Sequence, residues 1–216
     1  MRKNTICRIF RAAGGLFICA IGLYLTILAD VGLAPWDALC MGISYHLPVR
    51  YGTASVMVSL CVLVMDLLLR EPVGVGTVLD ALGVGKAVDL LQWLDVIPHP
   101  QGLVQSIVWL IAGMLVISVG QWIYMAAAMG CGPRDSLLVG LGKRVRRVPI
   151  GCVTMAVFAA VVLVSWALRG PIGIGTVLCV ALQGPCMQAV FRAVRFEPRN
   201  ITHESLLSTV GHLADR

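Results

Sequence analysis

Charged residues are scarce in this chain. Only 13% of its 216 residues are Asp, Glu, Lys or Arg, whereas 58% are hydrophobic and the mean hydropathy is +0.88. A soluble domain carries roughly 25% charged residues. One soluble core is too small to bury this apolar excess, so part of the solvent must be lipid. The composition therefore predicts an all-α membrane protein.

Motifs for common enzyme and nucleic-acid chemistry are also missing. The sequence contains no recognisable Ser-His-Asp set, nucleotide-binding loop or pair of catalytic carboxylates. The eight cysteines form no C-x-x-C pair and the four histidines stand at no ligand spacing, so we expect packing roles for the cysteines and no metal or cofactor. The alternatives for the cysteines are a stray disulfide or a path for a soft metal. The net charge of +6 comes without an RNA-binding motif. We therefore expect neither an enzyme nor a nucleic-acid partner.

What the sequence does contain is a repeat. Residues 70–79 read REPVGVGTVL and residues 169–178 read RGPIGIGTVL, while GLAPWDAL at 32–39 matches GCGPRDSL at 130–137. The chain is predicted to be a duplicated unit of about 100 residues. Residues 1–100 form the first membrane repeat, 101–195 the second, and 196–216 a cytoplasmic tail. In an apolar chain such a duplication is typical of transporters whose site lies between the halves.

Six stretches are long and apolar enough to cross about 30 Å of hydrocarbon. They are residues 10–29, Gly52–Leu69, Val73–Leu94, Leu103–Met129, Val148–Leu168 and Ile172–Phe191. Two shorter helices, from Pro35 to Pro48 and from Pro133 to Gly142, are predicted to enter the membrane without crossing it. A helix of about 12 residues reaches only about 18 Å.

The basic residues predict an orientation. If six stretches cross, fourteen of the seventeen Lys and Arg residues fall on the side of the N-terminus. By the positive-inside rule that side is the cytoplasm, so both termini are predicted to be cytoplasmic. Three spans in each half make the halves antiparallel, an inverted 3+3 repeat. The alternative is eight crossing segments with parallel halves, for which the charge distribution is nearly as good.

Each short helix begins with Pro-x-Asp, at Pro35–Asp37 and Pro133–Asp135. In one interpretation the acid accepts free backbone N–H groups in the first helical turn. In the other, the two acids face a central cavity and bind a cation or a proton. The middle residues are Trp36 in one half and Arg134 in the other, which breaks the symmetry, so we expect them to gate the site or to contact something different on each face.

The repeated Gly-x-Gly-Thr strings begin the third and sixth stretches. They comprise Gly74, Gly76, Thr77, Gly173, Gly175 and Thr176. The glycines allow a tight turn and close backbone approach, and the threonines are expected to cap the helices that follow. These helix starts are either purely structural or hold an anionic or carbonyl group on their unpaired N–H groups.

Charges interrupt the third stretch at Asp80, Lys86 and Asp89. Each charge inside a membrane costs about 2.5–3.5 kcal/mol and marks function by default. Lys86 and Asp89 share a helix face, so the alternative is a neutral pair that docks this stretch against its neighbours. In the second stretch, Asp66 is expected to lie at the membrane boundary beside Arg70.

Five strings resemble the YczE/YyaS/YitT group of bacterial integral membrane proteins, and its YczE-like branch most closely. They are GLAPWDALCMGIS, YGTASVMV, PVGVGTVLDAL, GCGPRDSLLVGL and GPIGIGTVL, and the likeness covers about residues 10–191. The resemblance implies a protein of the bacterial cytoplasmic membrane. Because the group has no established activity, it assigns no ligand residue to this chain.

These observations favour a small-solute transporter or permease of unknown substrate. The residues expected to line its site are Trp36, Asp37, Arg134, Asp135, Gly74, Gly76, Thr77, Asp80, Lys86, Asp89, Gly173, Gly175 and Thr176. Two other classes stay open: the substrate-binding subunit of an energised uptake system, and a membrane accessory or scaffold factor for an enzyme system. The expected partners are the lipid bilayer, a small molecule, and a second copy or an energising subunit.

Overall fold

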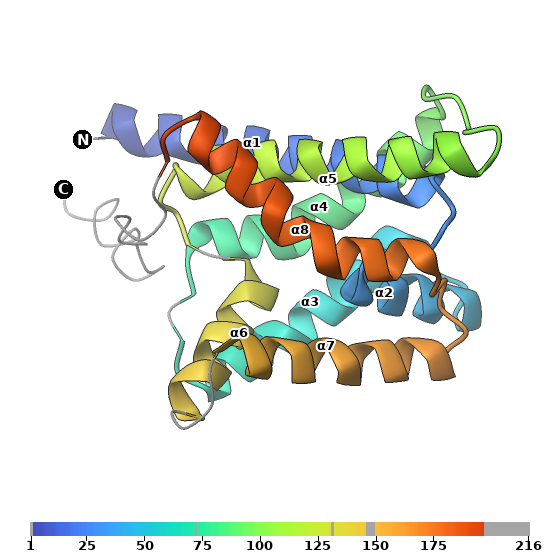
Figure 1. Cartoon of the computed structure of the whole chain (residues 1–216). Coiled ribbons are helices and arrows are strands. Elements are labelled where there is room, and N and C mark those ends of the chain that lie inside the picture. The colour runs from blue at the N-terminus through green and yellow to red at the C-terminus, as the bar shows by residue number, and fades with distance from the viewer. Residues whose placement is uncertain (1, 72, 131, 146–149, 197–216) are drawn as a thin grey trace.

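A computed structural model describes residues 2–71, 73–130, 132–145 and 150–196. Over these residues the chain forms eight helices and no strand (Figure 1). The helices are α1 (Arg2–Leu28), α2 (Pro35–His46), α3 (Tyr51–Leu68), α4 (Val75–Leu94), α5 (Leu103–Met125), α6 (Pro133–Arg144), α7 (Ile150–Ala167) and α8 (Ile174–Ala193). From residue 197 on, the predicted cytoplasmic tail lies outside the described residues.

Helices α1 and α5 lie side by side and run antiparallel, with four glycines at their crossing (Figure 1). A Cβ atom added to Gly15 would lie 2.9 Å from the carbonyl oxygen of Gly120, and one added to Gly22 would lie 2.6 Å from that of Gly113. The first glycine of one helix therefore meets the second glycine of the other. Lipid gives no hydrophobic drive between helices, so this close backbone approach supplies the attraction that holds them together.

The loop before each short helix binds the start of a long helix from the opposite half of the chain. In the first turn of α8, the N–H of Gly175 donates to the carbonyl of Val31, which precedes α2, at 2.7 Å. In the first turn of α4, the N–H of Gly76 donates to the carbonyl of Met129, which precedes α6, also at 2.7 Å. Two matching backbone crossings thus connect the two halves.

Both crossings require glycine in the loop. Gly32 has a φ of +109° and Gly130 a φ of +121°, values that L side chains rarely adopt. A Cβ atom at Gly32 would also lie 2.6 Å from the backbone nitrogen of Gly173, and one at Gly130 would lie 2.9 Å from the Cα of Gly74. Backbone conformation and lack of space therefore select the same residue.

Helix α2 has the length that the sequence predicts, whereas α6 is longer than predicted. Helices α2 and α6 contain 12 residues each and both begin with proline. A proline at the first helical position loses no hydrogen bond and has a suitable φ. Helix α6 ends at Arg144, two residues beyond the predicted Gly142. In Figure 1, α2 lies toward the right-hand end of the bundle and α6 toward the left-hand end.

Four helices are long and apolar enough to cross a membrane by their length and composition. Among the described residues these segments are Ile6–Leu28, Tyr51–Leu68, Leu103–Met125 and Ile174–Ala193. Helix α4 is not in this group, and it carries the charges of Asp80, Lys86 and Asp89. In α7 the apolar segment Cys152–Ala167 is shorter than the other four. Four of the six predicted spans are therefore supported on this criterion.

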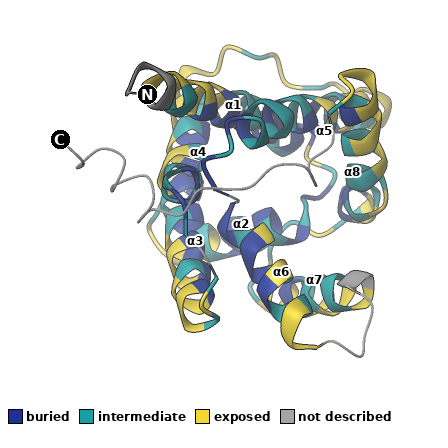
Figure 2. Ribbon diagram, turned by 90° about the vertical axis from the view of Figure 1, so that its left-hand side faces the viewer, coloured by how far each residue is buried: buried dark blue, intermediate teal, exposed yellow. Residues whose placement is uncertain are grey.

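Buried apolar residues gather around α2, which lies inside the arrangement of longer helices (Figure 2). Cys40 of α2 is 0% exposed and shares a cluster with Ala54 of α3, Val88 of α4 and Leu137 of α6. In contrast, large apolar side chains such as Trp166 of α7 are exposed. An apolar exterior around a packed interior is the pattern expected of helices in lipid.

Candidate functional site

An ion pair joins the beginnings of the two short helices. The Nη1 atom of Arg134, in the first turn of α6, donates to Oδ1 of Asp37, in the first turn of α2, at 2.8 Å. The side chains of Arg134 and Asp37 are 25% and 11% exposed, so this pair is largely shielded from solvent. Tyr51, the first residue of α3, donates its hydroxyl to the same Oδ1 atom at 3.1 Å. One interpretation of the sequence gave the Asp37 carboxylate a capping role within α2. In the structure it links α2, α3 and α6.

The guanidinium of Arg134 has further contacts with the first half. Its Cζ atom lies 5.8 Å from the ring centroid of Trp36, which is cation–π geometry. Its Nη2 atom faces Cys40 Sγ at 3.6 Å and Ser55 Oγ at 3.5 Å. That Trp36 and Arg134 gate a site or contact something different on each face stays a prediction. These matched positions contact each other, because the crossed loops bring the starts of α2 and α6 together.

Two more carboxylates lie near this ion pair, on either side of Gly132, which precedes α6. A Cβ atom added to Gly132 would lie 2.7 Å from Oδ2 of Asp80 and 3.7 Å from Oδ2 of Asp135. Asp80 is half-buried and comes from α4, whereas Asp135 is exposed and comes from α6. The absence of a side chain at residue 132 leaves room for both carboxylates.

We call these residues the central polar cluster. Its members are Trp36, Asp37, Tyr51, Asp80, Arg134 and Asp135. The cluster contains three carboxyl groups and one guanidinium, so it carries an excess of negative charge when the acids are ionised. Such a charge balance favours a cation or a proton as the bound species.

The two Gly-x-Gly-Thr helix starts use their backbone donors within the protein. The N–H groups of Gly76 and Gly175 bind carbonyl groups of the opposite half, as described above. Thr77 Oγ1 accepts the N–H of Gly74 at 3.1 Å, and its counterpart Thr176 Oγ1 accepts the N–H of Gly173 at 3.2 Å. The threonines therefore do cap these helices, but from the third helical position. The group held at each helix start is a backbone carbonyl.

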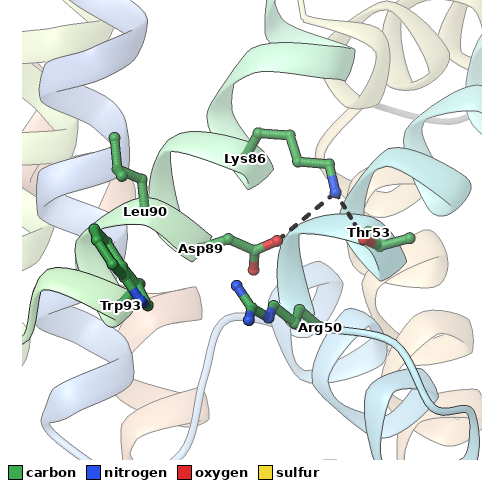
Figure 3. A pocket seen from close by; sticks show the side chains of 6 residues that line it. All are labelled: Arg50, Thr53, Lys86, Asp89, Leu90 and Trp93. Carbon is green, nitrogen blue, oxygen red and sulfur yellow. Dashed lines mark hydrogen bonds and ion pairs between the residues drawn. The ribbon is translucent and has the colours of Figure 1, made fainter.

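Lys86 and Asp89 lie elsewhere on α4, in a pocket beside the start of α3 (Figure 3). Asp89 Oδ1 accepts the backbone N–H of Gly52 at 2.7 Å, so a carboxylate from α4 caps α3. The Lys86 ammonium lies 3.8 Å from Asp89 Oδ2 and donates to Thr53 Oγ1 at 2.7 Å. This geometry agrees with the interpretation that the pair docks α4 against α3.

One residue has a different environment from the one that the sequence predicts, and one residue of the cluster is not predicted from the sequence. Asp66, two residues before the end of α3, is 0% exposed and neither of its carboxylate oxygens has a hydrogen-bond partner within the described chain, so it does not pair with the exposed Arg70, whereas its place at the membrane boundary stays a prediction. Tyr51 was not among the candidate residues. Its string YGTASVMV is one of those that carry the family resemblance, and that was the available signal.

Comparisons with known proteins place the chain in a family. Residues 6–192 match the model of a family of unknown function (DUF6198). This chain belongs to that family. An uncharacterized membrane protein YczE of Bacillus subtilis (strain 168) is 30% identical over 190 residues, which are 85% of each chain. The uncharacterized protein YyaS of the same strain is 29% identical over 175 residues, 79% of this chain and 85% of its own length.

A third relative comes from another bacterium. An uncharacterized protein of Haemophilus influenzae (strain ATCC 51907 / DSM 11121 / KW20 / Rd) is 28% identical over 173 residues, 80% of this chain and 78% of its own. No solved structure matches the chain. The resemblance to YczE and YyaS drawn from five short strings is therefore confirmed. The membrane-protein relative and the four apolar helices support a membrane location.

Proposed function

We propose that this protein is a small-solute transporter of the bacterial cytoplasmic membrane. In this proposal six helices cross the bilayer as an inverted repeat, and α2 and α6 are re-entrant half-helices. The ion pair between Asp37 and Arg134 carries the proposal, because it joins the first turns of both half-helices with charged groups from both halves. Discontinuous helices that meet between two repeats are where transporters bind substrates and coupling ions.

The arrangement of the helices supports an inverted rather than a parallel relation. Helices α1 and α5 occupy matching positions in the two halves and run antiparallel at their glycine crossing. Helices α2 and α6 are too short to span the bilayer and lie toward opposite ends of the bundle (Figure 1). The distribution of Lys and Arg then predicts cytoplasmic termini.

The central polar cluster favours a cationic substrate or a proton. Arg134 neutralises one of its three carboxylates, and Asp80 and Asp135 remain beside Gly132. A cation that binds the carboxylates of the cluster, Asp37 included, competes with Arg134 for Asp37 and weakens the tie between α2 and α6. A ligand shifts a conformational equilibrium only by binding the two states differently, and this competition provides such a difference.

A purified-protein assay tests the ligand class. Thermal unfolding in detergent is measured against a panel of cationic, neutral and anionic metabolites, since a ligand that binds only the folded form raises its apparent stability. We expect a cationic compound to stabilise the wild-type protein and to lose this effect in Asp80→Asn/Asp135→Asn. Stabilisation by anions alone would contradict the proposed class.

The transport step is tested with the compound found in that assay. Uptake of this compound into proteoliposomes should be abolished in Asp37→Asn/Asp135→Asn, while the protein remains inserted and folded. The control is Asp30→Asn/Asp95→Asn, which removes two acids that lie outside the cluster, at the ends of α1 and α4. Wild-type flux in the first double variant would refute the role of the cluster.

A binding subunit without its own transport cycle is the main competing class. Such a protein would bind the compound but show no uptake by itself, and it would co-purify with an ATPase pair. Uptake by the isolated protein in proteoliposomes would exclude this alternative.

A further inference from the structure

A second polar site lies away from the central polar cluster. It is a pocket of about 380 Å³ between the start of α3 and the C-terminal half of α4 (Figure 3). Its lining residues are Arg50, Thr53, Lys86, Asp89, Leu90 and Trp93. We call it the Arg50–Lys86 pocket. Arg50 and Lys86 are two of the three cations that do not fall on the predicted cytoplasmic side.

The charge balance of this pocket is positive. It contains one guanidinium, one ammonium and one carboxylate. The carboxylate of Asp89 is already engaged, because Oδ1 accepts the N–H of Gly52 at 2.7 Å and Oδ2 lies 3.8 Å from the Lys86 ammonium. At 3.8 Å an ion pair is not also a hydrogen bond. Arg50 is exposed, and Lys86 uses one of its three donors on Thr53.

Lys86 is a charged residue well inside α4 that stays accessible. It lies eight residues before the end of α4, about 12 Å along the helix axis, and its side chain is still 55% exposed. Lys and Arg side chains within membrane helices extend toward polar groups at the bilayer surface. Here the Lys86 side chain extends toward Thr53 and the Arg50 end of the pocket (Figure 3).

One wall of the pocket is apolar and open. Leu90 is 47% exposed and Trp93 is 71% exposed, and Trp93 is the penultimate residue of α4. Exposed Trp near a helix end is typical of the interface between acyl chains and headgroups. The pocket therefore presents two cations together with an apolar surface for hydrocarbon. A soluble anion would use the cations alone, whereas a phospholipid uses both surfaces.

We propose that the Arg50–Lys86 pocket binds the phosphodiester group of an anionic phospholipid, with its acyl chains along Leu90 and Trp93. Arg50 donates to the phosphate oxygens through its planar guanidinium, and Lys86 supplies a second charge from inside the bilayer. The pocket tethers the start of α3, directly before Tyr51 of the central polar cluster, to the lipid. This site does not depend on whether the protein transports a solute.

The full-length protein in detergent tests the proposal. Its thermal unfolding is measured with added phosphatidylglycerol, phosphatidylcholine, diacylglycerol or inorganic phosphate. We expect phosphatidylglycerol to stabilise the wild-type protein most. In Arg50→Gln/Lys86→Gln its apparent affinity should fall roughly tenfold for each charge-assisted hydrogen bond removed. The matched control is Arg70→Gln/Arg169→Gln, which removes two exposed cations outside the pocket and should keep the full response.

The outcomes separate the possible ligands. Stabilisation by inorganic phosphate without a further gain from phosphatidylglycerol would overturn the lipid assignment in favour of a free anion. An unchanged response to phosphatidylglycerol in Arg50→Gln/Lys86→Gln would overturn the site itself. If that variant does not fold, the single variants Arg50→Gln and Thr53→Val are measured instead, and a full response in both contradicts the proposal.

Discussion

The starts of α4 and α8 are built alike, but the charges on these two helices differ. In each, a threonine accepts the N–H of the residue before the helix, and a glycine N–H in the first turn binds a carbonyl of the opposite half. The matched side chains then diverge. Asp80, Lys86 and Asp89 of α4 correspond to Cys179, Pro185 and Gln188 of α8.

The comparison shows that backbone groups form the matching contacts between the halves, whereas charged side chains form the sites that differ. The crossings need only glycine, threonine and backbone groups, and both halves contain them. The Arg50–Lys86 pocket instead takes all three of its charged residues from the first half, and the central polar cluster takes two acids from the first half but one acid and the guanidinium from the second. Two halves with matching backbones therefore carry an asymmetric distribution of charge, so equivalent substitutions should have unequal effects.

The largest difference is expected between the matched positions 134 and 36. Arg134→Gln leaves the largely buried Asp37 carboxylate without its ion-pair partner, and we expect a loss of about 3 kcal/mol in unfolding free energy. Trp36→Leu removes the cation–π contact and keeps an apolar side chain against the buried cluster that Trp36 packs on, so it should cost about 1 kcal/mol. Both values are measured by denaturation in detergent.

A double variant controls for other effects of losing the guanidinium. Asp37→Asn should recover much of the stability lost in Arg134→Gln, because no unpaired charge then remains. If the losses of Arg134→Gln and Asp37→Asn simply add, the ion pair is not energetically coupled and this interpretation is refuted.

The second difference concerns the two backbone crossings. In Gly175→Ala the new Cβ would lie 2.4 Å from the carbonyl oxygen of Gly32, which belongs to the backbone and has little freedom to move. In Gly76→Ala it would lie 3.0 Å from the carbonyl oxygen of Met129. We expect losses of about 2–3 and about 1 kcal/mol, respectively, in the same unfolding measurement.

Gly184→Ala is the matched control for the crossings, because nothing lies within 4 Å of a Cβ atom built at Gly184 in α8. This control should be neutral or slightly stabilising, since alanine favours helix over glycine. Equal losses of unfolding free energy in Gly76→Ala and Gly175→Ala would contradict this prediction, because the effect would then not depend on the space around the added Cβ atom.

The smallest effect is expected where α3 and α7 differ at matched positions 66 and 165. Asp66 and Ser165 are both 0% exposed, and their side-chain oxygens have no hydrogen-bond partner within the described chain. An unpaired buried carboxyl costs more than an unpaired hydroxyl. Asp66→Ser should therefore raise the unfolding free energy by about 1 kcal/mol. A clear loss of stability would mean that Asp66 binds a species that the protein chain does not provide.

Several predictions from the sequence agree with the structure because they depend on local chemistry. Pro35 and Pro133 both begin short helices, since proline suits a first helical position. Glycines two turns apart form the contact between α1 and α5, because small residues allow helices to approach closely in lipid. The burial of Asp66 could not be predicted in this way, since it depends on neighbours that are distant in the chain.

The sequence by itself determined the apolar helical class, the two short helices and the matched positions, because composition, helix length and repetition are properties of neighbouring residues. Only the tertiary structure decided which groups of the first half bind which groups of the second half. The hydrogen bond from Gly175 to Val31 and the ion pair from Arg134 to Asp37 join residues that are far apart in the sequence. Their partners depend on how the helices pack, and local sequence patterns carry no information about that packing.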